Sequence, residues 1–167
     1  RNGQDGVPLT LETQNRARWD QLLIHRGLAA LERVRKLDGE DGPYALQAAL
    51  AACHARARHF RDTDWGRIAG LYDRLLTVLP SPVVALNRAV AHAIAFGPET
   101  GLALLEALKD EPALEGYAPM AAARGDFLLK AGRRAEARGA FEQAAELAGN
   151  QAERAFLLGR AKDCGAR

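Results

Sequence analysis

A recurrence of small residues at every 34th position is the feature that most constrains the fold of this 167-residue chain. At this step two rows of small residues align, Ala57, Ala91, Gly125 and Gly159 in one and Ala69, Ala103 and Ala137 in the other. Turns between helices fall at the same interval, at Asp64, Pro98 and Gly132. Because a period of about 20 to 50 residues is typical of repeat architectures, the spacing predicts stacked helix pairs with small side chains where the helices cross.

Proline residues mark where several helices begin. In Gly42-Pro43, Ser81-Pro82 and Gly97-Pro98, Pro stands in the first helical turn, where its missing N–H has no intrahelical partner to lose. Asn150 and Glu153 have the spacing of a capping box. We expect helices near residues 14–37, 43–60, 64–79, 82–96, 98–108, 117–131, 133–148 and 150–163. Strand signals are otherwise absent, so the sequence predicts an all-α fold.

The first thirteen residues, RNGQDGVPLTLET, differ from the rest of the chain. Their Gly and Pro and the alternating VPLTL pattern predict a linker with an extended, strand-like piece. We therefore divide the chain into a linker tail, residues 1–13, and a helical domain, residues 14–167.

The segment from Tyr117 to Asn150 resembles a tetratricopeptide repeat. Gly125 stands at the close-packing position, Gly132 at the turn, and the second helix carries Ala137, Phe141 and Ala144. The two preceding units are degenerate, one residue out of phase. The resemblance implies a right-handed α-solenoid of tetratricopeptide-like helical hairpins, about three pairs with a flanking helix at each end.

An apolar stripe on the helix near 64–79 has the spacing of a helix face, with Trp65, Ile68, Leu71, Tyr72, Leu75 and Leu79. One repeat cannot bury its own apolar face, so we interpret the stripe as core. A ligand-contacting role for Trp65 and Tyr72 is the alternative.

Side-chain patterns for catalysis are absent from the sequence. The single serine, Ser81, is better explained as a helix cap than as a nucleophile, and adjacent Cys53 and His54 point to different faces of a helix. The histidines lack metal-ligand spacing, and no glycine-rich phosphate loop follows a strand. We predict a non-enzymatic protein without a cofactor. Two isolated cysteines and the lack of a membrane-length apolar run or signal peptide favour the cytoplasm and no membrane partner.

Repeat solenoids bind their partners through the concave surface that the first helix of each pair lines. The repeat phase directs a mostly basic set of side chains to this surface. The set comprises His54, Arg58, Arg61, Arg88, His92, Asp126 and Leu129. We predict a groove that takes an acidic segment; simple solvation of an exposed face is the alternative.

Five blocks in order resemble the C-terminal extension of a group of bacterial extracytoplasmic-function RNA polymerase sigma factors. They are LETQNRARWDQLLIHRG, GPYALQAALAACHARA, DTDWGRIAGLYDRLL, SPVVALNRAVAHAIAFGPETGLALLEAL and NQAERAFLLGRA. The resemblance runs from about Asp5 to Cys164 and implies that promoter- and polymerase-binding regions precede a tetratricopeptide-like extension. This chain contains neither of those regions, so DNA binding would belong to the parent protein.

The resemblance implies a regulatory module that contacts the missing N-terminal sigma regions, the RNA polymerase core or a separate regulatory protein. Residues just after the linker would meet the parent's sigma regions, namely Arg16, Arg18, Trp19 and Asp20. Anchoring of the first helix is the alternative role for Trp19. The alternative function is a stand-alone tetratricopeptide adaptor that recruits an acidic peptide or protein.

Overall fold

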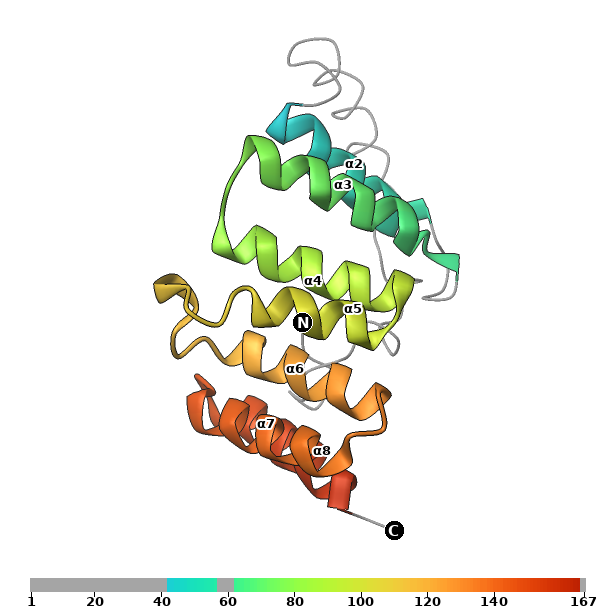
Figure 1. The fold of residues 1–167 in the computed structure, drawn as a ribbon. Coiled ribbons are helices and arrows are strands. Elements are labelled where there is room, and N and C mark those ends of the chain that lie inside the picture. The colour runs from blue at the N-terminus through green and yellow to red at the C-terminus, as the bar shows by residue number, and fades with distance from the viewer. Residues whose placement is uncertain (1–41, 57–61, 166–167) are drawn as a thin grey trace. The chain divides into compact units, whose positions relative to one another are not determined.

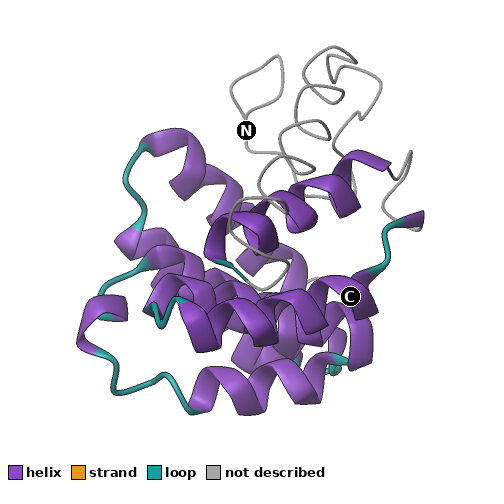
Figure 2. Cartoon of the chain, turned by 90° about the horizontal axis from the view of Figure 1, so that it is seen from above, coloured by secondary structure: helices purple, strands orange, loops and turns teal. Residues whose placement is uncertain are grey.

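A computed structural model describes residues 42–56 and 62–165 of the chain. All regular secondary structure in these residues is helical (Figures 1 and 2). Within these residues lie seven α-helices and one short 3₁₀-helix, and no strand. Their bounds are α2 Pro43–Arg56, α3 Trp65–Val78, α4 Pro82–Phe96, α5 Pro98–Glu106, η3 Pro112–Leu114, α6 Ala118–Lys130, α7 Arg134–Leu147 and α8 Gln151–Gly165. The predicted all-α class is confirmed. The predicted linker and the helix near 14–37 lie outside the described residues.

The helix starts follow the predicted punctuation. Pro43, Pro82 and Pro98 are each the first residue of a helix. Gly97 precedes Pro98 with a φ of 111°, a conformation that glycine adopts readily. Asn150 caps α8, because its side chain accepts a 2.8 Å hydrogen bond from the backbone N–H of Glu153, as an N-cap residue does.

Helix ends agree less closely with the sequence pattern. Helix α5 ends at Glu106 rather than near residue 108, and the unpredicted η3 follows it. Helix α8 continues to Gly165, two residues past its predicted end. There the Arg134 side chain donates hydrogen bonds to the backbone carbonyls of Asp163 and Cys164 at 3.0 and 3.1 Å. These carbonyls have no intrahelical partner, so Arg134 satisfies the end of α8 from the start of α7.

The chain divides into two compact units, with the boundary between Ala91 and His92 inside α4. We refer to the described residues up to Ala91 as the N-terminal unit and to residues 92–165 as the C-terminal unit.

In the N-terminal unit, α2 packs against α3. Buried side chains of α3 recur at three- and four-residue spacing, and they are Ile68, Ala69, Leu71 and Leu75. Trp65 and Tyr72 of the predicted stripe are half-buried. Leu79 was predicted to be core, but this prediction is wrong: α3 ends at Val78, so Leu79 leaves the helical stripe as its cap residue and is 38% exposed.

The Asp64 side chain caps α3 by accepting a 3.0 Å hydrogen bond from the backbone N–H of Arg67. Since loss of such a cap typically costs about 1 kcal/mol, we expect Asp64→Ala to lower the free energy of unfolding by roughly that amount in urea titrations followed by circular dichroism. Asp62→Ala is the matched control, because Asp62 is exposed and the N-cap of α3 is Asp64. Equal effects of the two substitutions would contradict the capping role.

In the C-terminal unit, α7 contacts both α6 and α8. The shared core consists of Ala121, Leu128, Ala137, Ala140, Phe141, Ala144, Ala145, Leu157, Ala161 and Cys164. A Cβ atom built on Gly125 of α6 would lie 2.8 Å from the Phe141 ring of α7. This helix crossing therefore requires glycine, which has no Cβ atom. Gly125 is a close-packing position, as its place in the repeat predicts.

The two rows of small residues are only partly buried. Ala69, Ala91 and Ala137 are almost completely buried, while Ala57 lies outside the described residues. Ala103 is exposed, and Gly159 faces open space on α8. In α5 the close approach occurs instead at Gly101, where an added Cβ atom would clash with Ala93 and lie 2.8 Å from Phe127. The repeat step thus does not hold for every helix.

Candidate functional site

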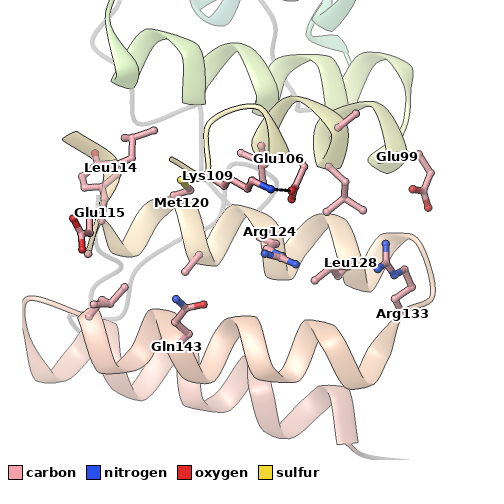
Figure 3. Close-up of a pocket in the computed structure, with 17 residues that line it drawn as sticks. Glu99, Glu106, Lys109, Leu114, Glu115, Met120, Arg124, Leu128, Arg133 and Gln143 are labelled. Atoms are coloured by element: carbon pink, nitrogen blue, oxygen red, sulfur yellow. Dashed lines mark hydrogen bonds and ion pairs between the residues drawn. The ribbon is translucent and has the colours of Figure 1, made fainter. Parts of the chain in front are cut away.

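A groove of about 580 Å³ lies among α5, α6 and α7 in the C-terminal unit (Figure 3). Its lining combines apolar and charged side chains from these helices and from the segment between α5 and α6. The lining residues are Glu99, Leu102, Ala103, Leu105, Glu106, Lys109, Leu114, Glu115, Gly116, Tyr117, Met120, Ala121, Arg124, Leu128, Arg133, Gln143 and Leu147. We call this surface the α5–α7 groove.

One face of α6 lies along the α5–α7 groove. Met120, Arg124 and Leu128 are spaced by four residues, so they project from the same side of the helix. Leu128 is buried, Met120 is half-buried and Arg124 is exposed. The buried Leu105 and Leu114 add apolar surface from α5 and η3. The groove therefore has an apolar floor below a charged rim.

Two basic residues of the rim are held by glutamates. Lys109 donates a 2.7 Å hydrogen bond to Glu106. Arg133 binds Glu136 through two nitrogens, Nε and Nη2, at 2.8 and 2.7 Å. Arg124 forms no hydrogen bond or ion pair with any residue that the structure describes, and it lies midway along the groove in Figure 3. Its charge interacts through space with Glu106 and Glu136, but its guanidinium donates no hydrogen bond to either carboxylate.

The hydrogen bond from Arg133 holds the pKa of Glu136 below its usual value. We expect Arg133→Gln to raise this pKa toward the ordinary value of about 4.3, as measured by NMR titration of the Glu136 carboxyl group. Because the pKa of Glu136 is lower in the folded state than in the unfolded state, the Arg133–Glu136 pair stabilises the fold at pH values above the unfolded-state pKa. This stabilisation is lost as the pH falls through the folded-state pKa.

Arg138→Gln is the control, because Arg138 pairs instead with Glu142. It should leave the titration of Glu136 unchanged. An identical Glu136 pKa in wild type and Arg133→Gln would show that the bidentate pair does not persist in solution.

The predicted groove residues of the N-terminal unit interact within the chain. The His54 ring lies edge-on to Trp65 with centroids 5.5 Å apart. Arg88 of α4 forms an ion pair with Asp73 of α3. Arg58 and Arg61 lie outside the described residues, as do Arg16, Arg18, Trp19 and Asp20 from the predicted contact with the parent.

The predicted groove residues of the C-terminal unit also have neighbours in the chain. The His92 ring lies 5.4 Å from that of Phe96, and Leu129 packs against the core. Asp126 of α6 forms an ion pair with Arg160 of α8, whose guanidinium carbon is 4.8 Å from the centre of the Phe141 ring. Of the predicted groove residues that are described, none lines the α5–α7 groove. A basic groove built from this set stays a prediction.

The environment of Cys53 disfavours a reactive Cys-His pair. Burial is the main cause that raises the pKa of the Cys53 thiol above its usual value, so the reactive thiolate is disfavoured. Within the described part of the chain, no three His, Cys, Asp or Glu side chains could together hold a metal ion. None of the helices in residues 42–56 and 62–165 combines the length and apolar character that a transmembrane span requires.

Comparison with known proteins gives a longer relative. The chain is 42% identical over 153 residues to an uncharacterized protein of Rhizobium meliloti. The aligned region covers 92% of this chain and 36% of the relative, so the chain spans about a third of the length of that protein. No protein-family model matches the chain, and no solved structure matches it.

Proposed function

We propose that this chain is a protein-interaction module, the C-terminal regulatory extension of a bacterial extracytoplasmic-function sigma factor. Its helices would stack as a right-handed solenoid of tetratricopeptide-like hairpins. The module would act in the cytoplasm on promoter-specific transcription initiation, and DNA would be bound only by the parent protein.

The α6–α7 hairpin is the observation that supports the repeat assignment most strongly. Gly132 follows α6 with a φ of 81°, and the Arg133 N–H donates to the Leu128 carbonyl. This is the pattern of a Schellman motif. Helix α7 begins directly after this turn, and its Phe141 returns to pack on Gly125 of α6. Close helix crossing combined with a tight glycine turn is what a tetratricopeptide-like unit needs.

The longer relative supports the view that sequences of this kind occur within larger proteins. Its aligned region leaves about two thirds of its length outside the match, which is room for further regions. The five sequence blocks that resemble the sigma-factor extension carry the assignment of those regions to a sigma factor.

Regulation by such a module requires a difference in affinity. The module, or a regulator bound to it, must bind one arrangement of the sigma regions or polymerase more tightly than another, since a ligand with equal affinity for both shifts nothing. The α5–α7 groove is a surface through which that difference could be exerted.

Two observations test the proposed parent. The reading frame upstream of Arg1 should encode a promoter-binding region with a basic helix-turn-helix, and the protein so encoded should co-purify with the RNA polymerase core. An initiator Met just before Arg1 would instead favour the stand-alone adaptor.

A further inference from the structure

The α5–α7 groove has a distribution of charge that specifies an occupant. Glu106 and Lys109 neutralise each other, and Arg133 is held by Glu136. Among the described residues that line the groove, Arg124 is the one cation without an ion-pair partner. Of the three acids in the lining, Glu106 is paired with Lys109, while Glu99 and Glu115 lie towards opposite ends of the groove in Figure 3, with Arg124 between them. The middle of the groove is therefore where a carboxylate of a bound ligand would meet a positive charge.

The surroundings of Arg124 favour apolar groups on both sides of that carboxylate. Along α6, Met120 lies about one turn before Arg124 and Leu128 about one turn after it. Tyr117 and Leu147 are each 37% exposed at the groove. Removal of water from large apolar side chains is energetically favourable, so a ligand that covered these two would be stabilised by doing so. An arginine that shares a groove with exposed aromatic and aliphatic side chains is typical of the central region of protein interfaces.

The shape of the α5–α7 groove favours a peptide over a small metabolite. Small-molecule sites enclose most of the ligand surface and are mainly apolar. Most residues lining this groove are instead exposed, and six of them are charged. From Tyr117 to Leu128 the groove follows α6 for about 17 Å, given a rise of about 1.5 Å per residue. About five extended residues cover this length.

We propose that the α5–α7 groove binds a peptide segment of a partner protein in which one Asp or Glu, held by Arg124, is flanked by apolar residues. This inference rests on the proposed role as an interaction module, and it does not depend on the parent being a sigma factor. It moves acidic-peptide recognition from the first-helix surface predicted from sequence to a different face of α6.

Selection of phage-displayed random heptapeptides on the full 167-residue chain tests the proposal. Enriched peptides should carry one Asp or Glu with Leu, Ile, Met or Phe within two positions. The best peptide, once synthesised, should bind Arg124→Glu and Arg124→Gln roughly 10- to 100-fold more weakly than wild type, because hydrogen bonds between charged groups are lost. Exchange of the peptide's acidic residue for Lys should restore binding to Arg124→Glu.

Arg154→Glu is the matched control, since Arg154 is exposed on α8, away from the groove lining, and the change in charge is the same. It should leave the peptide affinity within about twofold of wild type. Circular dichroism checks that each variant is folded, and Arg124→Gln tests the contact without adding a negative charge beside Glu106.

Three results would overturn the inference. The first is that the selected peptides share no acidic residue flanked by apolar ones. The second is that Arg124→Glu and Arg154→Glu weaken peptide binding equally. The third is that octanoate binds more tightly than the peptide in calorimetry, which would indicate a small-molecule site. Because these measurements do not involve transcription, peptide binding without any transcriptional effect would leave the groove assignment intact and contradict only the proposed sigma parent.

Discussion

Phe141→Ala should lower the free energy of unfolding by about 3–5 kcal/mol, the range for removal of a buried aromatic ring. Phe141 is 1% exposed, and its ring fills the crossing between α6 and α7 against Gly125. The reciprocal change, Gly125→Leu, should cost about 1–3 kcal/mol, because the new side chain would overlap the buried Phe141 ring. Urea unfolding followed by circular dichroism measures both effects.

Gly159→Leu is the control for Gly125→Leu, since Gly159 occupies the equivalent position of the next repeat unit but has no atom within 4 Å of an added Cβ. Gly159 lies inside α8, and leucine has a higher helix propensity than glycine. We therefore expect Gly159→Leu to raise the free energy of unfolding by about 0.5–1 kcal/mol. In the double variant Gly125→Leu/Phe141→Ala, the leucine occupies space vacated by the ring. Its total cost should therefore be smaller than the sum of the single costs by about 0.5–3 kcal/mol.

Strictly additive costs, or equal destabilisation by Gly125→Leu and Gly159→Leu, would contradict direct packing of Phe141 on Gly125. They would also remove the strongest structural support for the repeat assignment.

Helix starts could be predicted from this sequence because their causes are local. A proline in the first turn, or an asparagine cap, acts within one helical turn, so Pro82, Pro98 and Asn150 mark helix starts without reference to the rest of the fold. Helix ends depend more on distant contacts. The end of α8, for example, is satisfied by Arg134, which lies 29 and 30 residues earlier in the chain than the carbonyls it binds.

The repeat phase predicted close packing at Gly125 because the sequence from Tyr117 to Asn150 resembles a tetratricopeptide repeat. It failed at Ala103 and Gly159 for two different reasons. In α5 the close contact moves to Gly101, where Phe127 approaches, and on α8 no described atom lies within 4 Å of a Cβ added to Gly159. Periodicity in sequence describes an average repeat, whereas each crossing depends on the large side chain that meets it.

The α5–α7 groove was not predicted, although part of its signal is present in the sequence. Met120, Arg124 and Leu128 have four-residue spacing, but the functional face predicted for this helix carried Asp126 and Leu129. In the structure Asp126 is paired with Arg160 and Leu129 packs on the core. Sequence alone could not identify Arg124 as the cation without a partner, because that depends on which acids the fold brings to the other basic residues of the rim.

The proposed sigma-factor role predicts that removal of this module from its parent changes promoter-specific transcription by roughly 5- to 150-fold, the range that corresponds to a coupling free energy of about 1–3 kcal/mol. The reason is that an interaction module regulates only if its contacts favour one state of the sigma regions or polymerase. The direction of the change distinguishes an activating from an inhibitory module, and either direction agrees with a regulatory role.

Run-off transcription from the parent's own promoter, with purified polymerase core and either the full parent or the parent lacking residues 14–167, is the most direct measurement. The parent carrying Gly159→Leu serves as a control with the module intact. A regulatory extension predicts different transcript yields for the full and shortened proteins when both bind the core. Equal yields, together with an unchanged response of both proteins to the inducing condition in cells, would contradict it.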